Sequence, residues 1–545
     1  MTRKEKLYRE EYVTTIKRLL DYAVEHYPEL TYSRLLDTER GYTFTAFGQA
    51  CKAIVDKYDE LGIGAGEKIV LLAQNMPEWA VAFVATASSG RVIVPVLAES
   101  SAQEVSNIVE HSEAVGLFVS EAKKAQISPE VMDKMKFVYD LDTLQLVKET
   151  PGEPLTQPVA EPQPDDLAGL FYTSGTTGKA KGVMLSHRNL CQNVIAASYA
   201  QPAEEGQRWL SILPAAHTYE LAFSLLYPLF VGGEVSYLQK APTPSVLGRA
   251  LQEVKPHIVC SVPLIIEKIY RSSVRKTIDK SRTLIWMEHV FPHLTYRIIG
   301  GKLKKFFGGN LGFFGVGGAK LDPVVESFLI KAHFPYAIGY GLTETAPLIT
   351  AKVVGSGRCG TIGPHCHNVE VRLGNVDPST GEGEIQCKGP NVMLGYYKDP
   401  ERTAGVFTKD GWFRTGDLAS CSADGFYTIR GRLGSMIVGP SGENIYPEEI
   451  ESVINNFSGV GESLVVYKEG KLVAMVKFDE SVIDFDTQRT DQWMENIEEK
   501  KKALMEFVNA QVRKSNNINE VEIMEHPFVK TATMKIRRFL YQKKQ

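Results

Sequence analysis

One stretch of the chain, residues 172–187, concentrates small, hydroxylated and cationic side chains. Its glycines let the backbone turn sharply and approach a ligand, and its hydroxyl and ammonium groups can donate hydrogen bonds to phosphate oxygens. The residues that could supply these contacts are Thr173, Ser174, Gly175, Thr176, Thr177, Gly178, Lys179, Lys181 and Gly182. Apolar triplets on both sides, residues 170–172 and 183–185, are typical of strands. The pattern predicts a loop between two strands that holds a triphosphate.

Two alternatives apply to this segment. A Walker-type P-loop needs glycine at its first position and serine or threonine after its lysine, whereas this chain has Thr173 and Ala180 there, so the spacing fails. A flexible surface loop without a ligand is the other alternative, and the segments described next weigh against it.

A second segment places two glycines, Gly339 and Gly341, around Tyr340, followed by Thr343 and Glu344. The glycines permit a close backbone approach, the tyrosine offers a flat face, and a carboxylate beside phosphates is a candidate ligand for magnesium. The alternative is a glycine-rich turn with an exposed glutamate.

Asp417 and Arg432 can be placed together from local pairing. Asp424 and Gly425 form a strong signal for a two-residue hairpin turn, and pairing Ala423 with Phe426 brings Asp417 opposite Arg432. A carboxylate and a guanidinium at one end of a hairpin can bind a diol. A surface ion pair of small energetic value is the alternative.

The bulk properties limit the class of protein. A chain of 545 residues is too long for one compact core, so several domains are expected. The net charge of -4 gives no basic field that would attract nucleic acid. The first thirty residues lack the apolar segment of a secretory signal, and the longest uncharged apolar stretch, about residues 221–233, is too short to span a bilayer. We therefore expect a cytoplasmic protein without a membrane span.

Short apolar segments alternate with helical patterns, which predicts an α/β fold of helix-covered, mostly parallel sheets. Expected strands lie at residues 69–72, 92–94 and 115–119, and again at 257–260 and 311–314 in a second region that spans residues 190–345; expected helices begin at Pro77 and Ser101. Beyond Ile437, strands at 463–467 and 472–478 and a charged helix at 493–513 predict a small α+β domain.

Seven cysteines with irregular spacing favour reduced thiols over a disulfide framework. Cys359 and Cys366 beside His365 and His367 have the types of zinc ligands, but the segment runs into alternating apolar residues from Val369. The entrance to a strand is the preferred interpretation, and no structural metal is expected.

Read together, five segments resemble the adenylate-forming superfamily, which includes acyl-CoA synthetases, luciferases and peptide-synthetase adenylation domains. The resemblance covers nearly the whole chain and is closest to long-chain fatty acyl-CoA synthetases. The segments are residues 173–182, 339–345, 414–417, 431–432 followed by 442–451, and 530–536. The resemblance implies a large N-terminal domain over residues 1–431, a hinge at 432–436 and a mobile C-terminal domain over 437–545.

The resemblance also implies roles for individual residues. Tyr340 would stack on adenine, Thr343 would contact the α-phosphate and Glu344 would hold Mg²⁺. Asp417 and Arg432 would bind the ribose of ATP. The backbone of Gly317, Gly318 and Ala319 would line the adenine pocket.

Near the C-terminus, Lys535 would bridge the attacking carboxylate and the α-phosphate, with Lys530 as the alternative lysine. The chain departs from the family pattern at Val529, where proline is common, and at Met534, where glycine is common. At the hinge, Gly434 stands where relatives carry a charged residue, so backbone rotation is retained and the charge is lost.

His217, in the segment 213–220, resembles the acyl-pocket histidine of fatty acyl-CoA synthetases; a structural histidine is the alternative. Residues 297–305 are basic and interleaved with apolar residues. An ordinary amphipathic helix is the preferred interpretation, and contact with a CoA phosphate or with a membrane is the alternative.

These observations predict an ATP-dependent ligase that adenylates a medium- or long-chain fatty acid and transfers the acyl group to CoA, releasing AMP and pyrophosphate. The alternatives are a ligase that loads the phosphopantetheine arm of an acyl carrier protein, and a nucleotide-binding homologue without catalysis. Nucleic acid is not an expected partner, and peripheral contact with a membrane remains open.

Overall fold

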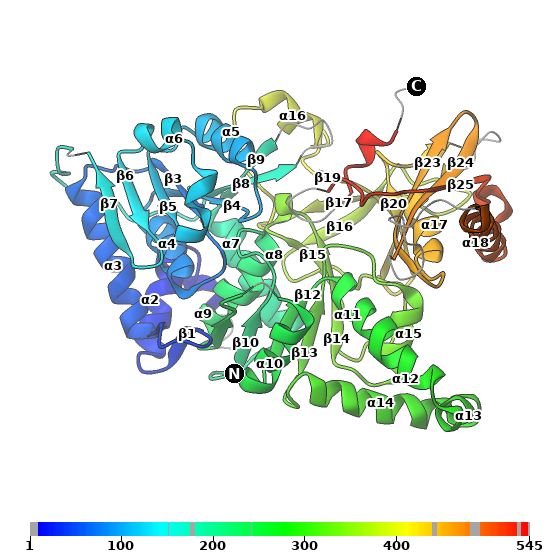
Figure 1. The fold of residues 1–545 in the computed structure, drawn as a ribbon. Helices are drawn as coiled ribbons and strands as arrows, with labels where there is room; N and C mark the ends of the chain where they lie inside the picture. Colours follow the sequence, from blue (N-terminus) through cyan, green and yellow to red (C-terminus); the bar gives the residue numbers. More distant parts are fainter. Residues whose placement is uncertain are drawn as a thin grey trace.

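The computed structural model describes residues 9–150, 152–174, 180–240, 242–438, 444–479, 491–530 and 536–542 (Figure 1). Two eight-stranded sheets form most of the molecule. Their inner strands pair in parallel except for the antiparallel pair β8–β9, and the pairs at both edges of each sheet are antiparallel. The first sheet has the order β15 (Leu348–Ala351), β14 (Tyr336–Gly341), β13 (Phe313–Val316), β12 (Ile258–Ser261), β10 (Arg208–Ser211), β11 (Glu234–Tyr237), β1 (Thr31–Leu35), β2 (Gly41–Thr43). The second has the order β18 (Gly395–Tyr396), β9 (Ala180–Ser186), β8 (Leu167–Ser174), β4 (Val92–Val96), β3 (Lys68–Leu72), β5 (Gly116–Val119), β6 (Phe137–Asp140), β7 (Gln145–Glu149). The expected helix-covered, mainly parallel α/β fold is confirmed.

Helices connect these strands and cover both sheets (Figure 1). They are α2 (Ile16–His26), α3 (Phe44–Glu60), α4 (Pro77–Ser88), α5 (Ala102–Ser112), α6 (Pro129–Lys134), α7 (His187–Ala200), α8 (Thr218–Leu221), α9 (Tyr227–Val231), α10 (Pro244–Val254), α11 (Pro263–Ile269), α12 (Lys276–Asp279), α13 (Arg282–Val290), α14 (Pro292–Phe306), α15 (Pro323–Lys331) and α16 (Pro400–Gly405). Two of them begin where the sequence predicts: Pro77 is the first residue of α4, and Ser101 caps α5 in a capping box with Glu104.

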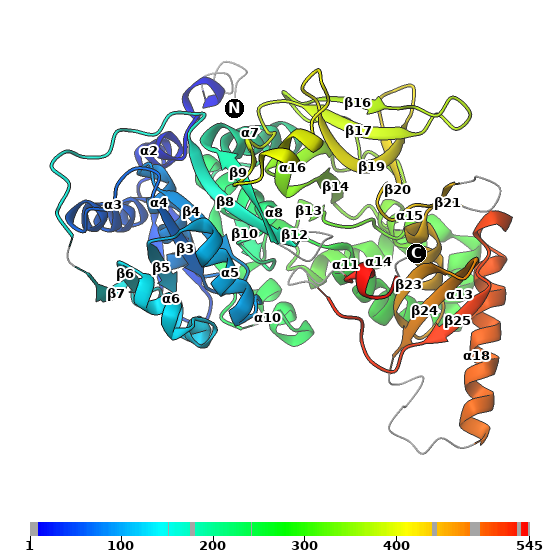
Figure 2. The same cartoon turned by 90° about the horizontal axis from the view of Figure 1, so that it is seen from above.

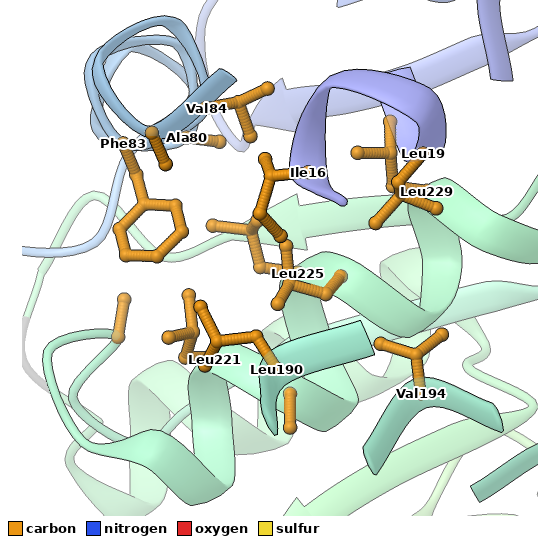
Figure 3. Close-up of a cluster of buried hydrophobic side chains, with 14 of the residues drawn as sticks. Ile16, Leu19, Ala80, Phe83, Val84, Leu190, Val194, Leu221, Leu225 and Leu229 are labelled. Carbon is orange, nitrogen blue, oxygen red and sulfur yellow. The ribbon is translucent and has the colours of Figure 1, made fainter. Parts of the chain in front are cut away.

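The main core lies between the two sheets. Figure 3 shows apolar side chains from α2, α4, α7 and the α8–α9 segment pointing toward one another, among them Ile16, Phe83, Val194 and Leu225. Inward side chains of both sheets belong to the same buried cluster. Every residue of α4 is buried, which explains why its sequence is apolar on all sides. Each fully buried aliphatic side chain contributes roughly 1.5–3 kcal/mol, so this helix layer fixes the two sheets relative to each other.

Four antiparallel strands make a third sheet, in the order β16 (Glu370–Gly374), β17 (Gly383–Lys388), β19 (Phe413–Cys421), β20 (Tyr427–Arg432). Two histidines and two cysteines precede β16. Cys366 is buried, and His367 stacks on Tyr199 with its Nε2 2.9 Å from a carboxylate oxygen of Glu10. Among the described residues, no three His, Cys, Asp or Glu side chains form a metal cluster.

The remaining chain forms a small α+β unit beside the four-stranded sheet (Figure 2). Its elements are β21 (Ile437–Val438), β22 (Asn444–Ile445), α17 (Pro447–Ile454), β23 (Val460–Lys468), β24 (Lys471–Phe478), α18 (Asp491–Asn509) and β25 (Glu520–Ile523). The charged helix expected to continue to residue 513 ends at Asn509. There the Asn509 amide accepts a hydrogen bond from the N–H of Ile518 and donates one to its carbonyl, which turns the chain toward β25. Within the described ranges, no helix has both the length and the apolar character needed to cross a bilayer.

Candidate active site

The turn at the end of β14 requires a glycine and is held in place by hydrogen bonds. A Cβ on Gly341 would lie 1.6 Å from the carbonyl oxygen of Pro347, so glycine is required there. The Thr345 hydroxyl accepts a hydrogen bond from the N–H of Leu342 (3.0 Å) and donates one to Pro347 O (2.6 Å). Asn193 of α7 donates to Thr345 O, 3.1 Å away. Residues 341–347 are thus held from both sides, with Thr343 and Glu344 on a single 3-10 turn.

Glu344 is a buried carboxylate with two partners from distant parts of the chain. Lys181 Nζ of β9 lies 2.7 Å from its Oε1, and the Tyr396 hydroxyl of β18 donates to the same oxygen at 2.9 Å. Lys181 also lies 3.0 Å from the Tyr396 oxygen. Burial alone would raise the pKa of Glu344, but the charge of Lys181 and these hydrogen bonds outweigh it and hold the pKa below its ordinary value. Glu344 is therefore ionised at neutral pH, as a ligand for a hard cation must be.

Asp417 connects β14 to the third sheet. The hydroxyl of Tyr340 donates to Asp417 Oδ2 (2.7 Å), and Arg432 Nε lies 2.9 Å from Oδ1. Asp417 is buried, whereas Arg432 is more than half exposed. The pair thus presents a guanidinium to solvent above a fixed carboxylate.

The expected pairing of Asp417 with Arg432 is confirmed, but the expected turn is wrong. Phe426 pairs with Ser422, whereas the expected partner of Phe426 was Ala423. The loop therefore has three residues and ends on Gly425, which has φ +81°. This shifts the register by one residue, and a bulge between Leu418 and Ala419 shifts it back. The two one-residue shifts cancel, so Asp417 still lies opposite Arg432.

One side chain at the start of the glycine-rich loop lacks a partner. Thr173 Oγ1, at the end of β8, is buried and has no hydrogen-bond partner among the described residues. An unpaired buried hydroxyl costs about 1–3 kcal/mol, which a phosphate oxygen would offset.

Outside the described residues lie Gly175, Thr176, Thr177, Gly178 and Lys179 of the loop and Lys535 near the C-terminus. Ser174 closes β8 opposite Ala180.

Residues on both sides of Lys535 form ion pairs with other parts of the chain. The alternative lysine, Lys530, pairs with Glu462 of β23, so its charge is already compensated. Arg537 lies 3.2 Å from Glu104 of α5. The C-terminal segment therefore reaches from the small unit to the N-terminal part of the chain.

Glycines at the end of β13 and directly after it pack against Tyr219. A Cβ on Gly317 would lie 3.2 Å from the Tyr219 ring, and one on Gly315 would lie 2.8 Å from its hydroxyl. Gly318 has φ +82°, a conformation that favours glycine. Gly317, Gly318 and Ala319 thus follow a strand end whose backbone is closely approached by an aromatic ring.

His217 is the N-cap of α8, and its Nδ1 accepts the N–H of Tyr219 at 3.2 Å. This bond explains its position in the fold, and its expected role at the substrate carboxylate stays a prediction. Three residues farther, Glu220 is only 1% exposed. The Ser211 hydroxyl donates to its Oε1 at 2.6 Å, and burial raises the pKa of Glu220 to about 7.

Two important contributors were missed at the sequence level. Tyr396 carries no recognisable motif, and its contact with Glu344 depends on the antiparallel bridge of β18 to β9. Asn193 lies inside a helix, and the only sequence signal for it was the number of polar residues in 187–193, which the structure buries in α7.

The sequence profile of the family described as AMP-binding enzyme matches residues 20–397. The probable acyl-activating enzyme 16 of Arabidopsis thaliana is 28% identical over 92% of this chain and 83% of its own. A long-chain-fatty-acid–CoA ligase of Mycobacterium bovis is 29% identical over 74% of this chain and 72% of its own. A long-chain-fatty-acid–[acyl-carrier-protein] ligase of Arabidopsis thaliana is 27% identical over 88% of this chain and 78% of its own. Among solved structures, o-succinylbenzoate CoA synthetase from Bacillus subtilis, in complex with ATP and magnesium, has a TM-score of 0.75 at 21% identity, covering 96% of this chain and 98% of that chain. This structural likeness concerns the fold.

Proposed function

The chain belongs to the AMP-binding enzyme family and is an AMP-forming ligase, and on this premise we propose that it joins a medium- or long-chain fatty acid to CoA. In the first step a carboxylate oxygen of the acid attacks the α-phosphorus of ATP, and the bond to the β-phosphate breaks to release pyrophosphate. In the second step the CoA thiolate attacks the acyl carbon, and AMP leaves with the bridging oxygen.

The observation that carries this proposal is the convergence on the segment from Tyr340 to Glu344. Tyr340 binds Asp417, the partner of Arg432, and Glu344 binds Lys181. Three sheets therefore bring together the residues that we assign to nucleotide binding.

Mg²⁺ and ATP fit the residues present. Mg²⁺ usually takes one or two carboxylates and completes its shell with water and substrate phosphates; the ionised, buried Glu344 offers one such carboxylate. Bound there, the cation would neutralise phosphate charge. Thr343 and Thr173 would donate hydroxyls to phosphate oxygens, and Asp417 with Arg432 would bind the ribose.

The fatty acid is proposed from the 213–220 segment and from the relatives named for long-chain acids. In this assignment His217 lies at the substrate carboxylate. A carrier protein is the second candidate acceptor, because one relative of this chain is named as a long-chain-fatty-acid–[acyl-carrier-protein] ligase. Both acceptors present the same phosphopantetheine thiol.

We further propose that residues 432–436 form a hinge between the 1–431 and 437–545 domains. Lys535 would stabilise the charge that develops in the first step, and rotation about Gly434 would remove it before the second. We propose a cytoplasmic location, which fits the seven cysteines, all of them free thiols.

The test is exchange of labelled pyrophosphate into ATP across a series of carboxylic acids of increasing chain length. We expect exchange with medium or long chains, and loss of exchange in Lys535→Ala while thioester formation from a synthetic acyl-adenylate persists. Product analysis with free CoA and with purified acyl carrier protein then identifies the acceptor. Absence of exchange with every fatty acid would refute the proposal.

A further inference from the structure

A helical hairpin at the outer edge of the molecule exposes an unusual number of large apolar side chains. Helices α13 and α14 project at the edge opposite the α2–α3 region (Figure 1). Trp286, Phe291 and Leu294 are 58%, 52% and 53% exposed. We call the exposed set the apolar face, and it consists of Ile285, Trp286, Val290, Phe291, Leu294 and Ile298.

The apolar face is not the side by which the hairpin packs on the protein. Thr295, Ile299 and Leu303 of α14 are buried on a different side of the helix. A Cβ on Gly300 would lie 2.1 Å from the carbonyl oxygen of Ala332, the residue that follows α15. The helix is therefore closely seated by its inner side. Exposure of the outer side is a property of the folded protein.

The hairpin and the short helical segment before it carry a local excess of positive charge. Residues 275–306 contain eight lysines and arginines and two carboxylates, in a chain whose net charge is -4. Arg275 binds both carboxylates, Asp279 at 2.6 Å and Glu288 at 2.8 Å. None of the other seven cations forms an ion pair with a carboxylate of the described residues. Six of them are exposed: Lys276, Lys280, Arg282, Arg297, Lys302 and Lys305.

The surface of an anionic bilayer is complementary to this hairpin. Its headgroup boundary accepts exposed apolar side chains, and its negative charge attracts the cations that have no carboxylate partner. Aromatic and aliphatic groups enter the headgroup region while lysine and arginine stay with the lipid phosphates. A second copy of the chain fits less well, because an isologous contact would bring the two positive surfaces together.

We propose that the α13–α14 hairpin docks on the surface of an anionic lipid bilayer, with the apolar face inserted at the headgroup boundary. This inference goes beyond the proposed ligase activity and does not depend on it, because the surface contains none of the residues assigned to ATP or acid. Docking places the enzyme where apolar carboxylic acids concentrate.

The first test is co-sedimentation with vesicles of phosphatidylcholine alone and of phosphatidylcholine mixed with phosphatidylglycerol. We expect the protein to bind only the anionic vesicles and to be released by salt, since screening weakens charge attraction at a surface. Binding that is absent, or equal on both vesicles, would overturn the proposal.

Variants separate the two contributions. Trp286→Ser with Phe291→Ser removes apolar contact, and Lys302→Glu with Lys305→Glu reverses charge; each pair should lower vesicle partitioning by roughly tenfold or more. The matched control is Val147→Ser, an equally exposed apolar side chain on β7. If the two double variants bind like the control, the hairpin is not the docking surface.

Two further measurements keep the result interpretable. Pyrophosphate exchange with a water-soluble acid should be unchanged in every variant, which shows that the fold and site are intact. Light scattering after size exclusion reports the oligomeric state. A wild-type dimer that the Trp286→Ser/Phe291→Ser pair dissociates would assign the apolar face to a second copy and overturn the proposal.

Discussion

Replacement of Glu220 by glutamine should make the protein less sensitive to alkaline pH. Burial raises the pKa of Glu220 to about 7 from its ordinary value of 4.5, so the folded protein keeps a proton that the unfolded chain has released. The stabilisation of the neutral acid is complete below about pH 4.5 and is lost as the pH rises toward and through 7. The gap between the two pKa values corresponds to about 3 kcal/mol, at ~1.4 kcal/mol per pKa unit.

Glutamine has the shape of the neutral acid and does not titrate, so its variant lacks this loss. The assay is thermal unfolding of both proteins from about pH 5 to about pH 8, where linkage predicts that the wild type loses about 2–3 kcal/mol relative to the variant. At about 2.1 cal/mol/K per residue, the unfolding entropy of the proposed 1–431 domain is roughly 0.9 kcal/mol/K, so the expected difference in Tm is about 2–3 °C. Ser211→Ala removes the hydroxyl that favours the ionised form of Glu220. The pKa of Glu220 in the folded protein should then rise further, and the stability lost between low and high pH should become larger. Parallel curves for wild type and Glu220→Gln would refute the reasoning.

Three further substitutions test the site and its supports. Gly341→Ala should reduce pyrophosphate exchange by roughly a hundredfold or more, because its Cβ would lie 1.6 Å from a backbone oxygen and must displace the turn that carries Glu344. The control is Gly339→Ala, whose Cβ meets only a leucine methyl at 3.2 Å and which should have a mild effect. Equal effects of the two variants would contradict the argument. Lys352→Met should destabilise the protein by about 3–5 kcal/mol in a denaturant titration, because it leaves the buried Glu326 without its counter-ion. Both side chains are 1% exposed, and adding Glu326→Leu should recover most of the loss. Gly434→Pro should slow thioester formation more than adenylate formation, whereas Gly434→Ala should spare both, since its Cβ meets nothing within 4 Å; an unimpaired proline variant would remove Gly434 from the proposed hinge.

The local parts of the fold could be predicted from the sequence. Strands of four to six apolar residues and capped helices such as α5 depend on neighbours in the chain, and they lie where periodicity and capping place them. The N-terminal strands β1 and β2 were not expected, because they join the first sheet beside β11, which lies some two hundred residues later. No local signal records such a pairing.

The site shows the same division. The pairing of Asp417 with Arg432 follows from one hairpin, although its turn and its bulge were not foreseen. The contact of Lys181 with Glu344 joins residues 163 positions apart, and the sequence predicted a phosphate partner for this lysine. Only the packing of β9 against the turn after β14 determines that the lysine and the carboxylate meet.

That contact makes the lysine a resident counter-ion for the buried carboxylate. If a divalent ion replaces it on Glu344, the ammonium of Lys181 is released toward whatever anion arrives with the ion, and the total charge of the site changes little. Affinity for the metal and affinity for the nucleotide would then rise together by the same factor, because thermodynamic reciprocity allows no other result. Each measured alone should be weak, and a neutral residue at position 181 should abolish the cooperation between them.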